Sequence, residues 1–353
     1  MEGIKLYAGL DVSQATTAIC IIRENGERVW EGSSMTEPPA IAEALAKYAP
    51  LLERAVLESG QLSTWLTREL RGLGLPVICV DARQAHKALS ARLNKSDSAN
   101  AESLAQLART GWFREVHVKS PEADRLRVLL AARRRLISCR KDIEAQLRGT
   151  LKTFGIKLGG VTAGGNRVSF REKVRAALTT DKILWAIVEP LLVIHKDICV
   201  QGSKLDRTVS AMARRSPIAK RLMTVSGVGI VTALTFMAVI DTPARFRRSS
   251  DAAAYIGLTP RRYQSGQVDY SGRISRSGNS ELRACLYEAG CAVLNRTKKF
   301  SALKSWGLRL AARKGFRKAA VAVARKIAVI MHRIWSDGTV FQWTSRKGDV
   351  AVA

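Results

Sequence analysis

Residues 4–11 read IKLYAGLD, a short apolar run that ends on the carboxylate of Asp11. The side chains alternate in character, with Tyr7, Gly9 and Asp11 on one face, and this period of two predicts a β-strand. Small polar residues follow, and a second apolar run at 17–22 predicts a hairpin. An acid at the end of a central strand can hold a metal ion, although a solvated turn aspartate is the simpler alternative. The residues downstream decide between these two interpretations of Asp11.

Residues 1–118 continue as alternating strands and helices. We expect further strands at 28–35, 55–58 and 77–80, and helices at 40–48, from 62 to Gly72 or Gly74, and at 97–108. Three antiparallel strands followed by alternating helices and strands are the order of a ribonuclease-H-like sheet. In that order the strand ending at Glu58 lies beside the strand ending at Asp11, so the two carboxylates would face each other.

The net charge of +28 is unevenly distributed along the chain. Up to Val118 there are 13 Lys and Arg against 14 Asp and Glu, whereas from Lys119 onward there are 45 against 16. A neutral domain therefore precedes a strongly basic remainder, and such asymmetry indicates a polyanionic partner. Because the sequence carries no lipid motif, we expect nucleic acid and no membrane.

Other features of the sequence exclude several classes of protein. No apolar run reaches the ~18 residues of a membrane span, and no signal peptide opens the chain. The six cysteines are scattered without a CxxC pair or a Cys/His cluster, so neither a zinc site nor a disulfide framework is indicated. We therefore expect a cytoplasmic protein.

Residues 119–212 predict a helical connector. One long helix is expected over 119–153, and a second helical run over 171–212 follows a glycine-rich break at 159–166. Two long helices joined in this way suggest a protruding hairpin or coiled coil, which could pair with a partner subunit or lie along a nucleic acid.

Residues 213–353 predict a third, helical domain. The run LMTVSGVGIVTAL at 222–234 resembles a helix-hairpin-helix, in which Gly227 and Gly229 allow a tight turn whose free amides can hold a backbone phosphate. An ordinary glycine-rich helical turn is the alternative. A basic amphipathic helix is expected over 318–335.

Three further residues could join Asp11 in a phosphoryl-transfer site. Glu58 ends the fourth predicted strand, and Asp97 begins a helix within the run KSDSANAE at 95–102. Asn100, three residues after Asp97, shares its face of that helix. Oxygen ligands of this kind are those that Mg²⁺ prefers. Each acid alone is a weak signal, but the combination at the ends of the right elements favours a magnesium site.

The stretch GLTPRRYQSGQVDYSGRISRSGN at 257–279 is rich in Gly, Ser and Arg and contains one acid. We expect a loop that presents Ser265. A serine flanked by arginines is suited to attack a phosphodiester, because guanidinium groups neutralise the phosphate and favour the alkoxide. A loop that only binds phosphate or RNA is the alternative. The flanking arginines are Arg261, Arg262 and Arg273, and together with Arg276 they are also expected to bind nucleic acid.

These motifs together resemble a known family. Asp11 at a strand end, Glu58 within VLES and the KSDxxNAE run resemble the DEDD domain of bacterial insertion-sequence transposases. SGVGIVTAL and GLTPRRYQSG…GRISRSGN resemble the second half of the same proteins. The resemblance covers essentially the whole chain and is to the one-hundred-and-ten insertion-sequence family, in its eleven-hundred-and-eleven group, whose members are bridge-RNA-guided recombinases.

The resemblance implies a RuvC-like domain over 1–118, a helical connector over 119–212 and a C-terminal transposase domain over 213–353. It implies that Asp11, Glu58 and Asp97 bind Mg²⁺ and that Ser265 attacks DNA to form a phosphoserine intermediate. A bridge RNA would pair with both donor and target DNA. The active sites would be shared between subunits of a dimer or tetramer, in a bacterial cytoplasm and at the nucleoid.

The chain departs from the family pattern at one position, where Asn100 stands in place of an aspartate. Asparagine keeps an oxygen ligand but loses a charge, so Mg²⁺ binding should weaken. Glu102 is a poor substitute, because five residues after Asp97 it points about 140° away on a helix. The chain is either naturally impaired or carries a substitution that traps an uncleaved complex, and the intact remainder of the motifs favours the second explanation.

Three functions are therefore open. The first is an RNA-guided recombinase that works through Ser265. The second is a metal-dependent nuclease of the Holliday-junction-resolving type, in which water is the nucleophile. The third is a nucleic-acid-binding protein with an impaired site, which would bind in a salt-dependent manner without cleavage.

Overall fold

The computed structural model describes residues 4–83, 85, 96–158 and 167–343. The chain divides into two compact units, Met1–Lys119 and Ser120–Ala353, and each is described by itself. The boundary of the first unit lies one residue beyond the end of the predicted N-terminal domain. The further division of the basic remainder at residue 212 stays a prediction.

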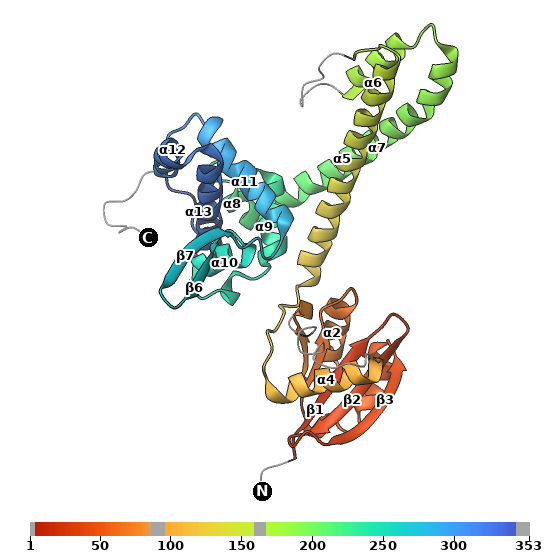
Figure 1. The fold of residues 1–353 in the computed structure, drawn as a ribbon, viewed down its shortest axis with the longest axis vertical. Helices are drawn as coiled ribbons and strands as arrows, with labels where there is room; N and C mark the ends of the chain where they lie inside the picture. Colours follow the sequence, from red (N-terminus) through yellow and green to blue (C-terminus); the bar gives the residue numbers. More distant parts are fainter. Residues whose placement is uncertain (1–3, 84, 86–95, 159–166, 344–353) are drawn as a thin grey trace. The chain divides into compact units, whose positions relative to one another are not determined.

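The first unit is built on a five-stranded mixed sheet in the order β3-β2-β1-β4-β5 (Figure 1). The pairs β1–β2 and β2–β3 are antiparallel, whereas β1–β4 and β4–β5 are parallel. The predicted strand order is thus confirmed. The strands are β1 Leu6–Val12, β2 Thr16–Arg23, β3 Arg28–Met35, β4 Leu52–Glu58 and β5 Val77–Val80.

Helices cover both faces of this sheet. One face packs against α1 (Pro38–Leu45) and α2 (Ser63–Gly72) through buried aliphatic side chains, and a short 3₁₀ helix (Ala49–Leu51) leads into β4. The other face packs against α4 (Asp97–Thr110). Because β1 is buried on both faces, its side chains are fixed by packing over most of its length.

Gly9 allows α4 to lie directly against β1. A Cβ atom added at Gly9 would lie 1.9 Å from the carbonyl oxygen of Ala101 and 2.3 Å from the backbone nitrogen of Ala105. No real side chain tolerates such distances, and the obstacles are backbone atoms of a helix, which cannot rotate away. Gly9 therefore sets how closely α4 approaches the strand that carries Asp11.

We expect Gly9→Ala to lower the free energy of unfolding of the first unit by about 3 kcal/mol, because α4 must move off the sheet. Urea denaturation of the full chain measures this change. Gly72→Ala, at the end of α2, is the matched control, since a Cβ there meets no atom within 4 Å. Equal unfolding midpoints for the two variants would contradict the packing argument.

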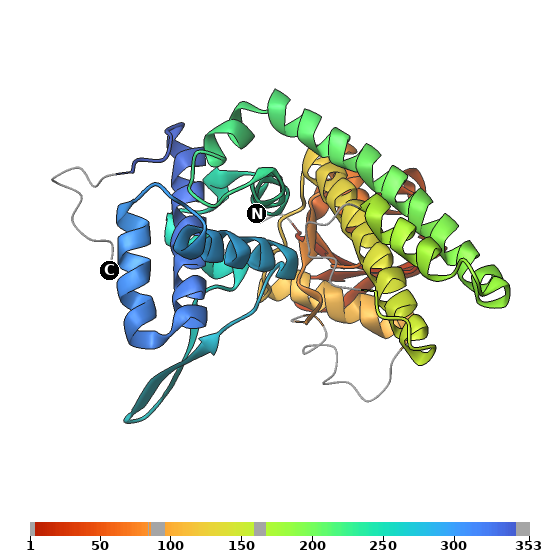
Figure 2. The same ribbon diagram turned by 90° about the horizontal axis from the view of Figure 1, so that it is seen from above.

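The second unit opens with a pair of long helices that run side by side, α5 (Pro121–Thr153) and α7 (Lys182–Arg215) (Figures 1 and 2). The predicted helix over 119–153 is confirmed as α5, with Ser120 as its N-cap. The single helical run expected over 171–212 is wrong. It is divided into α6 (Arg167–Ala177) and α7, because Asp181 caps α7 by accepting a hydrogen bond from the backbone N–H of Leu184. The glycine-rich break at 159–166 lies outside the described residues.

A polar cluster joins α5, α6 and α7 inside this pair. His195 is fully buried, and its ring lies 3.0 Å from a carboxylate oxygen of Glu144 and 3.3 Å from the guanidinium of Arg171. Burial lowers the pKa of His195, and the neighbouring Glu144 opposes that shift. Because the Arg171 guanidinium can only donate, Nδ1 of His195 accepts and its Nε2–H donates to Glu144. We interpret the cluster as structural.

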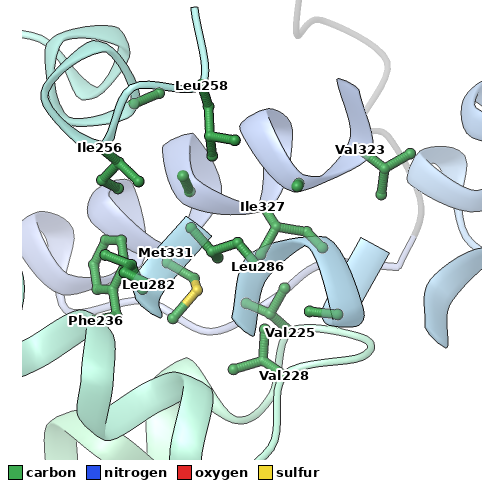
Figure 3. Packing of buried hydrophobic residues seen from close by; sticks show 14 of the residues in the cluster. Val225, Val228, Phe236, Ile256, Leu258, Leu282, Leu286, Val323, Ile327 and Met331 are labelled. Carbon is green, nitrogen blue, oxygen red and sulfur yellow. The ribbon is translucent and has the colours of Figure 1, made fainter. Parts of the chain in front are cut away.

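The rest of the second unit is a helical core with one added hairpin. Figure 3 shows the centre of the core, where Phe236, Leu286, Ile327 and Met331 are fully buried. The helices are α8 Pro217–Leu222, α9 Ile230–Ile240, α10 Ser249–Ile256, α11 Ser280–Asn295, α12 Ala302–Lys314 and α13 Phe316–Asp337, with a 3₁₀ turn at Pro243–Arg245. The amphipathic helix expected over 318–335 is α13, which buries one face in this core.

The segment predicted as a third domain, residues 213–353, is not entirely helical, and this corrects the expected fold. Residues predicted to form a loop make a two-stranded antiparallel sheet, β6 (Pro260–Ser265) and β7 (Val268–Ile274). All of β6 and the first part of β7 are exposed. Since neither face of this hairpin is buried, the sequence shows no apolar alternation that would mark the strands.

Candidate active site

Asp11 and Asn100 lie in contact at the end of β1. The amide nitrogen of Asn100 donates a hydrogen bond to Oδ2 of Asp11 over 3.1 Å, across 89 positions of sequence. Asn100 lies on the first turn of α4, and Ser96 caps that helix by accepting from the backbone N–H of Ala99. The close approach of α4 over Gly9 brings the two side chains together.

Glu58 lies on the strand next to Asp11. In the parallel pairing of β1 and β4, Leu10 is opposite Leu57, so Asp11 and Glu58 are the next residues on neighbouring strands. Val56 belongs to the face that α4 covers. By the alternation of a strand, Glu58 is on that same face. The predicted juxtaposition of the two carboxylates at one sheet edge is therefore seen in the backbone register.

Asp97 stands close enough to affect the ionisation of Asp11. Burial raises the pKa of Asp11, the hydrogen bond from Asn100 lowers it, and the charge of Asp97 raises it further, with a net upward shift. Asp97 itself is exposed at the first position of α4. A net raised pKa means that this site disfavours additional negative charge when no cation is present.

The donor set fits a hard divalent cation in its chemistry. It would consist of the carboxylates of Asp11, Glu58 and Asp97 and the amide of Asn100, which contacts Asp11, and oxygen ligands suit Mg²⁺. In the part of the chain that the structure describes, no three His, Cys, Asp or Glu side chains converge as metal ligands. The side-chain amide of Asn100 donates a hydrogen bond that holds the carboxylate of Asp11 in place. An aspartate at position 100 would instead repel that carboxylate when no cation is bound.

Glu102 lies away from this cluster, as the helix geometry predicts. Its carboxylate accepts a hydrogen bond from the guanidinium of Arg28 on β3, over 3.2 Å. Arg28 also pairs with Glu31, which in turn accepts from Ser98. These contacts fix the solvent side of α4 against β3, so Glu102 serves the fold of the first unit and cannot replace Asn100 at the sheet edge.

Ser265 lies at the tip of the hairpin. It ends β6 and is paired with Val268, so Gly266, with a φ of 55°, and Gln267 form the turn. Ser265 is exposed. The hydroxyl of an exposed turn serine can reach a bound phosphodiester without moving the fold.

The arginines near Ser265 in sequence lie in different places on the hairpin. Arg262 makes a two-point ion pair with Asp269 across the strands, with 2.8 Å between Nε and Oδ1. Arg261 donates to the carbonyl of Ser275 at the base of the hairpin, and Arg273 precedes the last residue of β7 at that same base. Within this one chain the hairpin does not gather the three guanidinium groups around Ser265, and their phosphate-binding role stays a prediction.

The remaining predicted nucleic-acid residues lie in the second unit. Arg276 follows β7 with a φ of 54° and is exposed. Gly227 has a φ of 80°, and its Cα packs against the backbone of α11, where a Cβ would lie 2.5 Å from the carbonyl oxygen of Ala289. Gly229 is the N-cap of α9, with open space around it. The turn between α8 and α9 thus requires Gly227 for packing, whereas the contact of Gly229 with phosphate stays a prediction.

Sequence reasoning missed one feature of this hairpin. Tyr263 and Tyr270 are directly paired across the strands, and their rings stack with centroids 5.0 Å apart. The spacing of the residues around Gly266 could have predicted this pair. Tyr263 is two residues before Ser265 on one strand, and Tyr270 is two residues after Val268 on the other. A turn at Gly266 would have paired these residues.

Two models of known protein families match separate parts of the chain. Residues 8–156 match the DEDD transposase model of the IS110 type, and residues 219–305 match the model described as "Transposase IS116/IS110/IS902 family". The first match contains all four residues of the acidic site, and the second contains the hairpin with Ser265.

Two bacterial relatives are similar over most of their length. The transposase for insertion sequence element IS1111A of Coxiella burnetii is 28% identical over 348 residues, which are 95% of this chain and 90% of the relative. A protein of Pseudomonas aeruginosa named "Probable family 20 transposase" is 28% identical over 289 residues, which are 80% of this chain and 83% of the relative.

The two matched segments and the near full-length similarity define the class of protein as an insertion-sequence transposase. The chain belongs to the IS110 family, and its similarity to the IS1111A transposase supports the IS1111 group. The family expected from the sequence motifs is therefore confirmed. Membership of this family implies an enzyme that binds and rearranges DNA and that uses a divalent metal ion. None of the helices that the structure describes is long and apolar enough to cross a membrane.

Proposed function

We propose that the protein is an RNA-guided DNA recombinase that moves an insertion sequence by transesterification at Ser265. The observation that carries this proposal is the contact of Asn100 with Asp11, with Glu58 on the next strand and Asp97 close by. These oxygen groups come from three separate elements and lie at one edge of a mixed sheet. We interpret that sheet as RuvC-like, because its strand order is that of the ribonuclease-H-like proteins.

The proposed step exchanges one phosphodiester for another. The Oγ atom of Ser265 forms a bond to the scissile phosphorus, the bond from phosphorus to the leaving DNA oxygen breaks, and the serine proton is transferred to solvent or to that oxygen. The product is a phosphoserine linkage to one DNA end. Attack on it by a hydroxyl of another strand restores a DNA phosphodiester and frees Ser265, so the bond energy is conserved through the exchange.

The acidic residues would hold Mg²⁺ in this proposal. Asp11, Glu58 and Asp97 supply charge and Asn100 supplies an amide oxygen. When bound, Mg²⁺ offsets the negative charge of the scissile phosphate. The protein's own contribution is positional, because packing of α4 on Gly9 and the hydrogen bond from Asn100 fix the Asp11 carboxylate before DNA arrives.

The partners follow from the charge of the second unit and from the family. The 45 Lys and Arg from Lys119 onward would bind a bridge RNA together with donor and target duplex DNA. We further propose a homodimer or homotetramer, in which the acidic site of one subunit meets Ser265 of another. A protein with these partners acts in the bacterial cytoplasm, at the nucleoid.

A denaturing gel tests the proposal. The protein is incubated with Mg²⁺, its own element's RNA and labelled donor and target DNA, and then denatured. A DNA band that migrates with the protein and disappears after protease treatment is the expected result. Cleaved DNA ends without such an adduct would favour the second candidate, a resolvase-type nuclease that uses water, and would overturn the serine mechanism.

Asn100 motivates a third candidate, an impaired form that binds nucleic acid without cleaving it. We expect Asn100→Asp to raise Mg²⁺-dependent strand exchange, because it restores the fourth carboxylate of the family pattern. In metal-free buffer the same change should destabilise the first unit by about 2 kcal/mol, since Asp11 loses its donor and gains a like charge. Strand exchange and thermal unfolding with and without Mg²⁺ measure the two effects.

Gln106→Glu is the matched control for this experiment. It adds the same charge to α4, but Gln106 contacts Arg109 and the backbone of Gly26 instead of Asp11. Its response to Mg²⁺ should equal that of the unaltered protein. Equal strand exchange by the unaltered protein and by the Asn100→Asp variant would show that a carboxylate at this fourth ligand position is dispensable.

A further inference from the structure

The two faces of the β6–β7 hairpin differ in chemistry. By strand alternation, Tyr263 and Ser265 share one face with their partners Tyr270 and Val268. The opposite face carries the ion pair of Arg262 with Asp269 and is therefore polar. The candidate nucleophile thus lies on the aromatic and apolar face of the hairpin.

The aromatic face is open to solvent. Tyr263 is 44% exposed, Tyr270 is 56% exposed and Val268 is 57% exposed. The two tyrosine rings are nearly parallel, with an interplanar angle of 18°. A cross-strand aromatic pair stabilises a hairpin by itself, so stacking alone does not demand a ligand. The neighbours of the pair distinguish a binding surface from a purely structural pair.

Gly272 holds one ring in place. A Cβ atom at Gly272 would lie 2.7 Å from Cε2 of Tyr263, so the ring occupies the space of the missing side chain. Tyr263 thus lies over the bare backbone of β7 at Gly272 and against Tyr270, and both rings keep part of their surface exposed. A ring fixed in this way loses little conformational entropy when it binds a flat partner.

Charge selects the kind of partner. Asp269, the one acid in residues 257–279, is already paired with Arg262 on the polar face, so no carboxylate stands beside the tyrosines in the strand register. Arg273 and Arg276 are exposed near the base of the hairpin. By strand alternation Arg273 is on the polar face, so these cations lie near the base of the hairpin and not beside the rings. Cations for the phosphates and aromatic faces for the bases on one exposed hairpin are nevertheless the combination that binds nucleic acid.

We propose that Tyr263 and Tyr270 form a stacking platform for an unpaired DNA base next to the phosphate that Ser265 attacks. The inference rests on the proposed function of Ser265. Residues two apart on a strand are about 7 Å apart, and this is no more than the rise of two nucleotides at about 3.4 Å each in a stacked duplex strand. The stacked base would therefore be one or two nucleotides from the attacked phosphate. The base must be unpaired and unstacked, because only then is its face free for the rings.

The experiment compares single-stranded and duplex DNA in the full chain. Fluorescence anisotropy with a labelled 20-nucleotide mixed-sequence strand and with the corresponding blunt duplex is measured in metal-free buffer, where no cleavage occurs. A second strand with 2-aminopurine at one position reports stacking through quenching of its fluorescence. Because neither readout needs chemistry at Ser265, the platform can be confirmed or overturned whether or not the adduct forms.

Replacement of both tyrosines by valine is the informative change. Valine keeps the strand preference and cross-strand packing of the hairpin but has no aromatic face. We expect affinity for the single strand to fall about 10- to 100-fold, with loss of quenching, while affinity for the duplex stays within about twofold. Replacement of both by phenylalanine should keep single-strand affinity and quenching. Gly272→Ala should give an intermediate loss, because it displaces Tyr263 without removing a ring.

Each other result overturns the platform. Single-strand affinity equal in the valine and unaltered forms would make the pair structural, and equal loss with valine and phenylalanine would assign the effect to the hydroxyl groups. Equal loss for duplex and single strand would indicate a backbone contact only. A change of oligomer size with unchanged DNA affinity would show that the face binds another copy of the chain. Trp112→Ala, which removes a 75% exposed ring from the first unit, is the control and should change nothing.

Discussion

Ser265→Ala is expected to abolish the covalent protein–DNA adduct, with a loss of at least about 10⁴-fold in strand exchange. The change removes one hydroxyl from an exposed hairpin tip, so the free energy of unfolding should change by less than about 0.5 kcal/mol. Nucleic-acid affinity should stay the same, because the basic residues and the tyrosine pair are untouched. The denaturing gel and a binding titration on the same preparation separate these effects.

Ser271→Ala is the matched control for this variant. Ser271 lies on the same hairpin, is also exposed, and is paired with Arg262 on the polar face. It should support normal adduct formation. An adduct that persists in Ser265→Ala, or that disappears in both variants, would remove Ser265 from the role of nucleophile.

The sheet of the first unit could be predicted because its strands are marked by burial. β1 is apolar from Leu6 to Leu10 and β4 contains the apolar run at 55–57, so these short apolar runs located both strands. The start of β4 was placed three residues late, because Glu53 and Arg54 interrupt the apolar pattern where the strand has one exposed side. The strand order then followed from the sequence of elements.

The hairpin in the second unit could not be predicted in the same way. Its strands bury nothing, and they are held by the turn at Gly266, the Arg262–Asp269 pair and the stacked tyrosines. These are pairwise contacts without a period. The break between α6 and α7 was missed for a related reason, since α6 ends at Ala177 and Asp181, the N-cap of α7, starts a new helix within an apparently continuous helical pattern.

The placement of the acidic residues near one sheet edge was predictable, but their contacts were not. Strand ends and the helix start brought Asp11, Glu58 and Asp97 to one edge, as their order in the sequence implied. The sequence could not indicate that Asn100 donates to Asp11, or that Gly9 sets the distance between them. Both facts depend on how closely a helix lies on a strand, which is a property of packed backbone atoms.

Asp11→Ala is expected to reduce Mg²⁺-dependent strand exchange by at least about 10³-fold, because it removes the carboxylate at the centre of the acidic cluster. Thermal unfolding of this variant should no longer respond to Mg²⁺, whereas the unaltered protein should be stabilised by ligand binding. Glu102→Ala is the control, since its carboxylate is bound to Arg28 outside the cluster. It should lower stability slightly and leave the response to Mg²⁺ intact. A full response to Mg²⁺ in Asp11→Ala would place the metal elsewhere.

Mixing the Asp11→Ala and Ser265→Ala proteins tests whether two subunits share one site. If each subunit used its own Asp11 and Ser265, every site in a mixed oligomer would lack one of the two groups, and the mixture would be as inactive as its components. If the acidic cluster of one subunit acts with Ser265 of another, one arrangement in each mixed dimer has both groups, and activity returns in part. We expect this recovery, and we expect it only after the subunits have been allowed to exchange. A mixture that stays inactive, although mixed oligomers are shown by differently tagged chains, would mean that each chain completes its own active site.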